Sequence, residues 1–237
     1  MEMCSKHALA VMEDGDLDLA VSVALGGAFG GSGQKCTASS RLVVHEAVHD
    51  AFVERLVAGA RAMRVGHALD PGTEMGPVVS TEQLAANLDY VALGRAEGAE
   101  LACGGARLNM AQEGHYMSPA VFTGTTNAMR INREEMFAPI ACVIKAGGYD
   151  EALEIVNDTE FGLTSGIVTR DLARATHFRR NARTGCVMVN LPTAGTDYHV
   201  PFGGRGDSSY GPREQGRYAA EFYTTVKTAY IAAGTPG

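Results

Sequence analysis

Apolar side chains along the chain change between the spacing of helices and the spacing of strands. Residues 16–28 begin with acidic side chains and carry a mixed apolar face, which predicts a helix that the following glycines end. Residues 41–46 are rich in β-branched side chains and predict a strand. Residues 47–63 predict a helix, because apolar side chains recur on one face at Val48, Phe52, Leu56, Ala60 and Met63.

The same order continues toward the C-terminus. Ser80 and Gln83 have the spacing of a capping box, which predicts a helix that ends near Gly98. The remaining patterns predict strands over 99–105, around 116–124, and over 140–146, 164–170 and 186–190, with helices over 150–157 and 171–182. Alternating helices and strands are typical of an α/β fold with a largely parallel sheet.

The C-terminal part departs from this alternation. Glycines and Pro212 make residues 200–216 irregular, and residues 221–234 predict a strand of β-branched and aromatic side chains with no helix after it. An exposed apolar strand edge invites aggregation. We therefore expect this strand to pair with another domain or another subunit.

Composition narrows the classes of protein that fit. A chain of 237 residues, 46% of them hydrophobic, can bury the core of one large domain or two small ones. The net charge of −7, without a basic patch, argues against nucleic acid or an anionic membrane as a partner. No apolar run reaches the roughly 18 to 20 residues that span a bilayer, and acids near Met1 argue against a signal peptide. We expect a cytoplasmic protein whose partners are small molecules or other proteins.

The five cysteines are odd in number, widely spread and form no CxxC pair, so we expect free thiols rather than a disulfide framework. The seven histidines show no metal-ligand spacing, and no metal site is expected.

Cys36 stands in the small and polar run "FGGSGQKCTASSR" (29–41), which is unlike the surroundings of a core cysteine. A lone cysteine is more often an inert apolar residue than a nucleophile, but the glycines here allow a turn that exposes the thiol. Such a thiol needs a base nearby. Glu2 and the pair Glu134 and Glu135 are candidate carboxylates, although acids in these positions are more often solvated surface groups.

Several segments together resemble one enzyme family. "MEMCSK", "FGGSGQKCTASSR", "REEMFAPI", "VPFGGRGDSSYGPREQG" and "YTTVKTAY" are similar, in order and spacing, to the catalytic half of the NAD(P)-dependent aldehyde dehydrogenase superfamily. The resemblance runs from Glu2 to about Tyr230. The segment "SSYGPREQGRYAAEFYTTVKTAY" most resembles the α-ketoglutaric semialdehyde (2,5-dioxopentanoate) dehydrogenases.

The resemblance implies a three-layer α/β fold, NAD or NADP as cofactor, and a role for each matching position. Cys36 matches the nucleophile, with its backbone N–H as an oxyanion donor, and Glu2 matches the general base. Glu135 matches the acid that holds the nicotinamide ribose, and Phe137 matches the aromatic beside it. The residues that match the lining of the aldehyde channel are Lys35, Thr37 and Phe202.

The resemblance also implies a division of the chain. Residues 1–206 match the catalytic domain, and 207–237 match a C-terminal segment whose strand joins subunits into a homo-oligomer. The family's N-terminal cofactor-binding domain is expected to be absent from this chain. The chain departs from the family where glycines are replaced by Cys4, Ser5 and Ala138 and an asparagine by His7, and these bulkier side chains are expected to crowd the nicotinamide or restrict Glu2.

Three functions remain open at this point. The first is the catalytic portion of an aldehyde dehydrogenase, acting plausibly on 2,5-dioxopentanoate and poorly active by itself. The second is a non-catalytic module that associates through the tail strand. The third is a thioesterase-like hydrolase that uses Cys36 and Glu2 without a cofactor.

Overall fold

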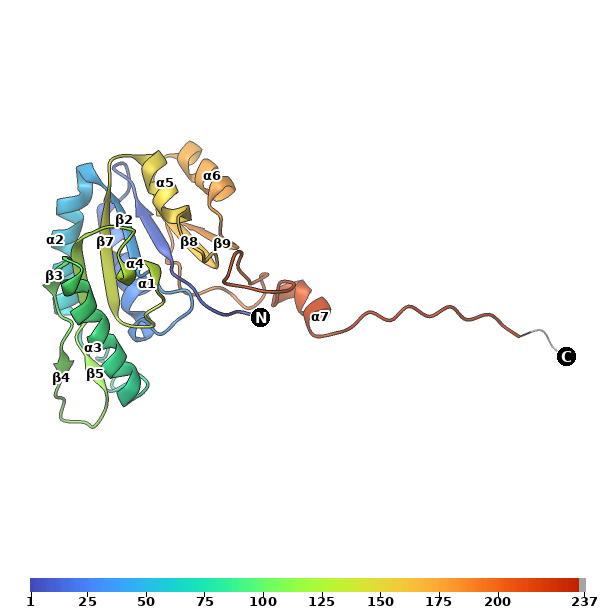
Figure 1. Cartoon of the computed structure of the whole chain (residues 1–237), viewed down its shortest axis with the longest axis horizontal. Coiled ribbons are helices and arrows are strands. Elements are labelled where there is room, and N and C mark those ends of the chain that lie inside the picture. The colour runs from blue at the N-terminus through green and yellow to red at the C-terminus, as the bar shows by residue number, and fades with distance from the viewer. Residues whose placement is uncertain (235–237) are drawn as a thin grey trace.

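A seven-stranded sheet organises the chain in the computed structural model, which describes residues 1–234 (Figure 1). The strand order is β3-β6-β7-β2-β1-β8-β9, and every neighbouring pair is parallel except β3 with β6. The strands of this sheet are β1 (Ala8–Val11), β2 (Arg41–His45), β3 (Glu100–Cys103), β6 (Ala120–Thr125), β7 (Ile140–Ala146), β8 (Thr164–Val168) and β9 (Cys186–Val189). The predicted parallel α/β sheet is confirmed.

Helices cover both faces of this sheet (Figure 1). Leu9 and Val11 of β1 pack with α1 (Leu17–Phe29) and α2 (Glu46–Ala62) on one face. Ala8 and Ala10 point to the other face, where α5 (Tyr149–Asn157) and α6 (Leu172–Asn181) lie. The central strands are therefore apolar on both sides, as parallel strands between two helix layers must be. The three-layer arrangement is confirmed.

Side-chain caps decide where several helices begin. Asp16 accepts the backbone N–H groups of Asp18 and Leu19 at 3.1 and 3.0 Å and starts α1. Ser80 accepts the N–H of Gln83 at 3.2 Å and starts α3 (Thr81–Ala96). The Gln83 side chain donates to Asn87 and to the carbonyl of Met136 instead of returning to Ser80, so half of the predicted capping box forms.

Within the sheets, one strand prediction was wrong and one strand was not predicted. The strand predicted around 116–124 is two strands: β5 (Tyr116–Met117) pairs with β4 (Arg107–Leu108) in a separate small sheet, and β6 begins only after Pro119. Proline has no N–H to donate to a ladder, so it separates them. The analysis of periodicity also missed β1, because alanines at two of its four positions give it a low strand propensity.

The chain leaves the body of the protein after the short helix α7 (Ala219–Phe222), and residues 223–234 run outward (Figure 1). The strand predicted over 221–234 is not formed here: its first two residues are helical and the rest have no regular structure. A strand needs a hydrogen-bonding partner along its edge, and this segment has none among residues 1–234. Residues 235–237, the end of the predicted C-terminal segment, lie outside the described part.

The two ends of the body are joined to each other. The backbone N–H of Met3 donates to Ser208 at 2.9 Å, and that of Tyr210 donates to Met1 at 2.8 Å. These bonds cross the predicted division between 206 and 207 and hold the segment that carries Glu2. Over residues 1–234, no helix combines the length and apolar content that crossing a membrane requires.

A tight turn follows α1 and carries the chain toward Cys36. Gly31, Ser32 and Gly33 all have positive φ, at 65°, 60° and 66°. A Cβ on Gly33 would also run into the backbone carbonyl of Ala138. This position therefore needs glycine both for its φ and for the close approach of the loop that contains Glu135.

We predict that Gly33→Ala destabilises the protein by at least about 2 kcal/mol more than Gly124→Ala does, because only the first adds a backbone clash to the unfavourable φ. Gly124 is the matched control, since its φ is 64° and a Cβ there would meet nothing within 4 Å. The free energy of unfolding of both variants is measured by urea denaturation. Equal destabilisation of the two would contradict the close contact with Ala138.

Candidate active site

The candidate catalytic residues lie where the chain enters the parallel strands. Glu2 precedes β1, Cys36 precedes β2, Glu135 precedes β7, and Cys186 is the first residue of β9. Parallel strands begin at one shared edge of the sheet, so side chains far apart in sequence meet there. The negative charges of the Glu135 and Glu2 carboxylates both raise the pKa of the Cys36 thiol. The predicted nucleophile and base therefore share one site.

Cys36 is half-buried, neither enclosed in the core nor fully exposed. Burial raises the pKa of its thiol, and the negative charges of Glu135 and then Glu2 raise it further, while its own backbone N–H lowers it. The preceding helix α1 ends before this loop, so the positive end of a helix dipole does not face the sulfur. The thiol is thus mostly protonated at neutral pH and needs a base to become a nucleophile.

The carboxylate of Glu2 is held by the C-terminal part of the body. Its Oε2 accepts a hydrogen bond from the hydroxyl of Ser209, and that hydroxyl oxygen accepts the backbone N–H of Gly204 at 2.6 Å. A Cβ on Gly203 would lie 3.2 Å from Oε1 of Glu2, so glycine leaves room for the carboxylate. Ser209 and Glu2 are 207 positions apart in the sequence, so only the folded chain reveals this contact.

Glu135 and Phe137 lie on the loop before β7. Oε1 of Glu135 accepts the backbone N–H of Ser5 at 3.0 Å, and burial raises the pKa of this carboxyl. Phe137 has a positive φ of 53° and leaves 39% of its surface exposed, an unusual conformation for an aromatic residue. Glu135, Phe137 and Lys35 line one small cavity of about 20 Å³.

The other two predicted substrate residues are enclosed. Thr37 is 7% exposed, and its backbone carbonyl accepts the Thr193 hydroxyl at 2.8 Å. Phe202 is 9% exposed, and its backbone exchanges two hydrogen bonds with Glu214. Their place along an aldehyde channel stays a prediction.

Positions that differ from the family pattern have definite roles here. The hydroxyl of Ser5 and Nε2 of His7 both contact the backbone carbonyl of Cys36. Burial lowers the pKa of His7 to about 4, so its ring is neutral. Cys4 is exposed, and burial and the charge of Glu135 raise the pKa of its thiol. Ser5 and His7 thus contact the backbone of Cys36, and the expected crowding of the nicotinamide or of Glu2 stays a prediction.

Cys186 is a site residue that the sequence analysis did not select. The Cys186 thiol contributes to the raised pKa of Cys36. The N–H of Gly203 and the charge of Arg213 lower the pKa of Cys186 itself, and the charge of Glu2 raises it. Burial is the largest cause of its own raised pKa. No sequence pattern marks this residue, because its position depends on β9 lying parallel to β8.

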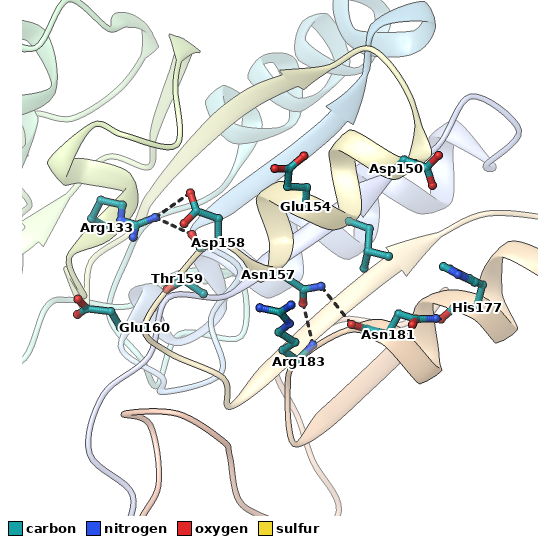
Figure 2. Close-up of a pocket in the computed structure, with 11 residues that line it drawn as sticks. Arg133, Asp150, Glu154, Asn157, Asp158, Thr159, Glu160, His177, Asn181 and Arg183 are labelled. Carbon is teal, nitrogen blue, oxygen red and sulfur yellow. Dashed lines mark hydrogen bonds and ion pairs between the residues drawn. The ribbon is translucent and has the colours of Figure 1, made fainter.

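A larger groove of about 830 Å³ lies between α5 and α6 (Figure 2). Arg133 pairs with Asp158 at 3.2 Å, and Asn157 bonds both the N–H of Arg183 and the carbonyl of Asn181. These polar groups satisfy one another, and no cysteine lines the groove. Within residues 1–234, no group of three His, Cys, Asp or Glu side chains is arranged to hold a metal ion. The edge that carries Cys36 is therefore the better candidate for catalysis.

Comparison with known proteins assigns the chain to a family. Residues 1–229 match the aldehyde dehydrogenase family. The chain is 38% identical over 233 residues to α-ketoglutaric semialdehyde dehydrogenase of Bacillus subtilis (strain 168), a match that covers 98% of this chain and 48% of the relative. It is 41% identical over 236 residues to betaine aldehyde dehydrogenase of Mesorhizobium japonicum, covering 99% and 48%.

The fold is likewise similar to a solved structure of this group. A crystal structure of betaine aldehyde dehydrogenase from Staphylococcus aureus in complex with NAD⁺ superposes with a TM-score of 0.90 at 32% identity. The match covers 94% of this chain and 44% of that chain. The chain thus spans about half the length of the curated relatives it matches.

We predict that Glu135→Gln lowers the pKa of the Cys36 thiol, because it removes the negative charge that raises this pKa most. The rate of alkylation of Cys36 by iodoacetamide at neutral pH should rise about three- to tenfold, as followed by mass spectrometry of the Cys36 peptide. Glu134→Gln is the matched control, since Glu134 pairs with Arg130 and does not act on Cys36. A rise as large in the control would show that the effect is not specific to Glu135.

Proposed function

The chain belongs to the aldehyde dehydrogenase family, and from this premise we propose that it is the catalytic portion of an NAD(P)-dependent enzyme that oxidises an aldehyde to a carboxylic acid. The observation that carries the proposal is the half-buried Cys36 thiol with the Glu2 and Glu135 carboxylates acting on it. A thiol whose pKa is raised in this way stays protonated until a base takes its proton, which suits a nucleophile formed on demand.

In the proposed reaction Cys36 loses its proton to Glu2 and Sγ adds to the aldehyde carbon, forming a thiohemiacetal. The backbone N–H of Cys36, which lowers the pKa of its own thiol, is proposed to donate to the resulting oxyanion. After oxidation, the carbon is held as a thioester on Sγ. Glu2 passes the proton that it took from Cys36 to solvent and then removes a proton from the water that attacks the thioester. It returns this second proton to Sγ as the carboxylic acid leaves, which restores the thiol.

The residues present fit the nicotinamide end of the cofactor. When bound, NAD⁺ or NADP⁺ supplies a ring that accepts the hydride from the thiohemiacetal carbon. One oxygen of Glu135 is already held by the N–H of Ser5, which orients the carboxylate for ribose hydroxyls. The exposed ring of Phe137 lies beside it and offers an apolar face to the nicotinamide end. Lys35, Thr37 and Phe202 are proposed to contact the aldehyde.

For the substrate we propose 2,5-dioxopentanoate, the semialdehyde of α-ketoglutarate. The support is the tail similarity described above together with the Bacillus subtilis relative, which is named for this substrate. Betaine aldehyde is the competing substrate, because the Mesorhizobium relative is named for it at similar identity. The five free cysteines support a cytoplasmic location.

We expect little turnover by these 237 residues alone, because the family resemblance implies that the cofactor-binding domain lies in the half of the relatives that these residues do not match. The test is stopped-flow absorbance of NADH or NADPH with 2,5-dioxopentanoate or betaine aldehyde. The chain is assayed alone and mixed with the N-terminal half of the Bacillus subtilis relative. Turnover should appear only in the mixture, favour 2,5-dioxopentanoate, and fall more than about 10³-fold in Cys36→Ala.

Two results would overturn this proposal. Robust turnover by the chain alone would mean that the N-terminal half is not needed to position the cofactor. Equal turnover by Cys36→Ala in the mixture would remove Cys36 as the nucleophile. Ester cleavage without cofactor, abolished in Cys36→Ala, would instead favour the thioesterase-like function.

A separate observation supports a second role, which is association through the tail (residues 223–234). The large apolar side chains of the outgoing segment are almost fully exposed, among them Val226 at 95% and Ile231 at 94%. We propose that this segment forms a strand when it pairs with a second copy of the chain, giving a homo-oligomer.

We predict that Val226→Lys with Ile231→Lys shifts the protein toward the monomer in sedimentation velocity, because charge opposes burial of the strand. Leu69→Lys is the control, since Leu69 is also exposed, at 85%, but lies outside the tail. A monomeric unsubstituted chain, or an oligomer that survives the tail substitutions, would contradict the role of the tail.

A further inference from the structure

Three consecutive polar side chains are buried in the segment that leads into β1. Ser5, Lys6 and His7 are 5%, 2% and 3% exposed. Ser5 and His7, two residues apart, turn to the same side and both reach the backbone carbonyl oxygen of Cys36. Arg41 binds the backbone carbonyl of Lys6 at 3.0 Å and holds the segment in place. Two side chains from the segment before β1 thus hold the peptide group of Cys36, which lies before β2.

The proton positions follow from the partners. Both ring nitrogens of His7 face a carbonyl oxygen, which only accepts. The N–H of Thr164 can donate only to an unprotonated Nδ1, so the one proton of a neutral ring is assigned to Nε2, which donates to Cys36. Nδ1 accepts the N–H and the hydroxyl of Thr164, at 3.0 and 2.8 Å. Nδ1 also lies 2.6 Å from the Thr164 carbonyl, a contact that only a second ring proton would satisfy. Burial opposes that charge, so the ring is a neutral donor to Cys36.

Ser5 has a second contact that connects two parts of the site. Its backbone N–H donates to Oε1 of Glu135 at 3.0 Å, while its hydroxyl oxygen lies 3.5 Å from the same carboxylate oxygen. A hydroxyl has one proton, and here it goes to the carbonyl of Cys36. Ser5 therefore joins Glu135 to the backbone of Cys36. Glycine at this position would keep the backbone hydrogen bond to Glu135 and lose the hydroxyl bond to the Cys36 carbonyl.

We propose that Ser5 and His7 are positioning residues that hold the Cys36 carbonyl from one side, and that Ser5 links the position of the nucleophile to Glu135. Two donors on this carbonyl fix the rotation of the peptide that carries the thiol. They also draw negative charge away from an oxygen that lies close to the sulfur, which favours the thiolate. The inference rests on the proposed function, since Glu135 is taken as the group that meets the cofactor ribose.

The test is the pH dependence of Cys36 alkylation by iodoacetamide, with the Cys36 peptide quantified by mass spectrometry to separate it from the other cysteines. Ser5→Ala should move the midpoint to higher pH and slow alkylation at neutral pH about two- to tenfold, the effect of one hydrogen bond. Ser165→Ala is the matched control, because it removes another buried serine hydroxyl, one that bonds Thr184 at 2.8 Å and not the Cys36 carbonyl.

His7 provides a second pair of variants should Ser5→Ala fail to fold. His7→Leu removes the donor and should slow alkylation, whereas His7→Gln keeps an amide N–H near the position of Nε2 and should restore most of the rate. Ser5→Ala in the background of Glu135→Gln tests the link, since linked residues give a rate change that is not the product of the two single changes.

The outcomes separate this inference from the proposed function. A midpoint unchanged in Ser5→Ala, or shifted equally in Ser165→Ala, would overturn the positioning role. Equal rates for His7→Leu and His7→Gln would do the same. Independent effects of Ser5→Ala and Glu135→Gln would overturn the link alone. If Cys36 in the unsubstituted chain never reacts at any pH, the nucleophile assignment itself is wrong.

Discussion

Parallel pairing of β1 with β2 and β8 is the constraint on which the whole site depends. It brings the entries to these strands to one edge of the sheet, and Glu2, Cys36 and Glu135 each stand just before a strand. Open α/β sheets usually bind ligands at the carboxyl ends of their strands. The candidate site lies at the opposite end, where its residues precede the first residues of the strands.

The chemistry of the site follows from where its charges lie. A cysteine at a helix N-terminus is ionised in advance, but here the neighbouring groups are carboxylates and the preceding helix ends before the thiol. Such a thiol is protected from indiscriminate reaction while no substrate is bound. The cost is that a base must remove the proton, and Glu2, whose carboxylate Ser209 holds, is the base that we propose.

The replacements at Ser5 and His7 show how a departure from a family pattern can be absorbed. Both add side-chain volume at positions where the family has smaller residues, which by itself predicts crowding. In the folded chain the added atoms are hydrogen-bond donors that meet the carbonyl of Cys36. Buried polar atoms with partners stabilise an arrangement, whereas the same atoms without partners would oppose it. The close packing of Gly33 against Ala138 completes this side of the site.

By itself the sequence determined the alternation of helices and strands, the parallel sheet and the identity of Cys36 as the unusual cysteine. Local propensities, caps and the order of motifs carry that information without any knowledge of contacts. Tertiary structure alone decided that alanine-rich β1 is a central strand and that β5 pairs with β4 outside the main sheet. It also decided that the tail forms no strand in a single chain and that Cys186 lies near Cys36. These outcomes depend on which backbone groups find partners and which loops meet at a shared edge, and such pairings join residues too far apart for any local pattern to record.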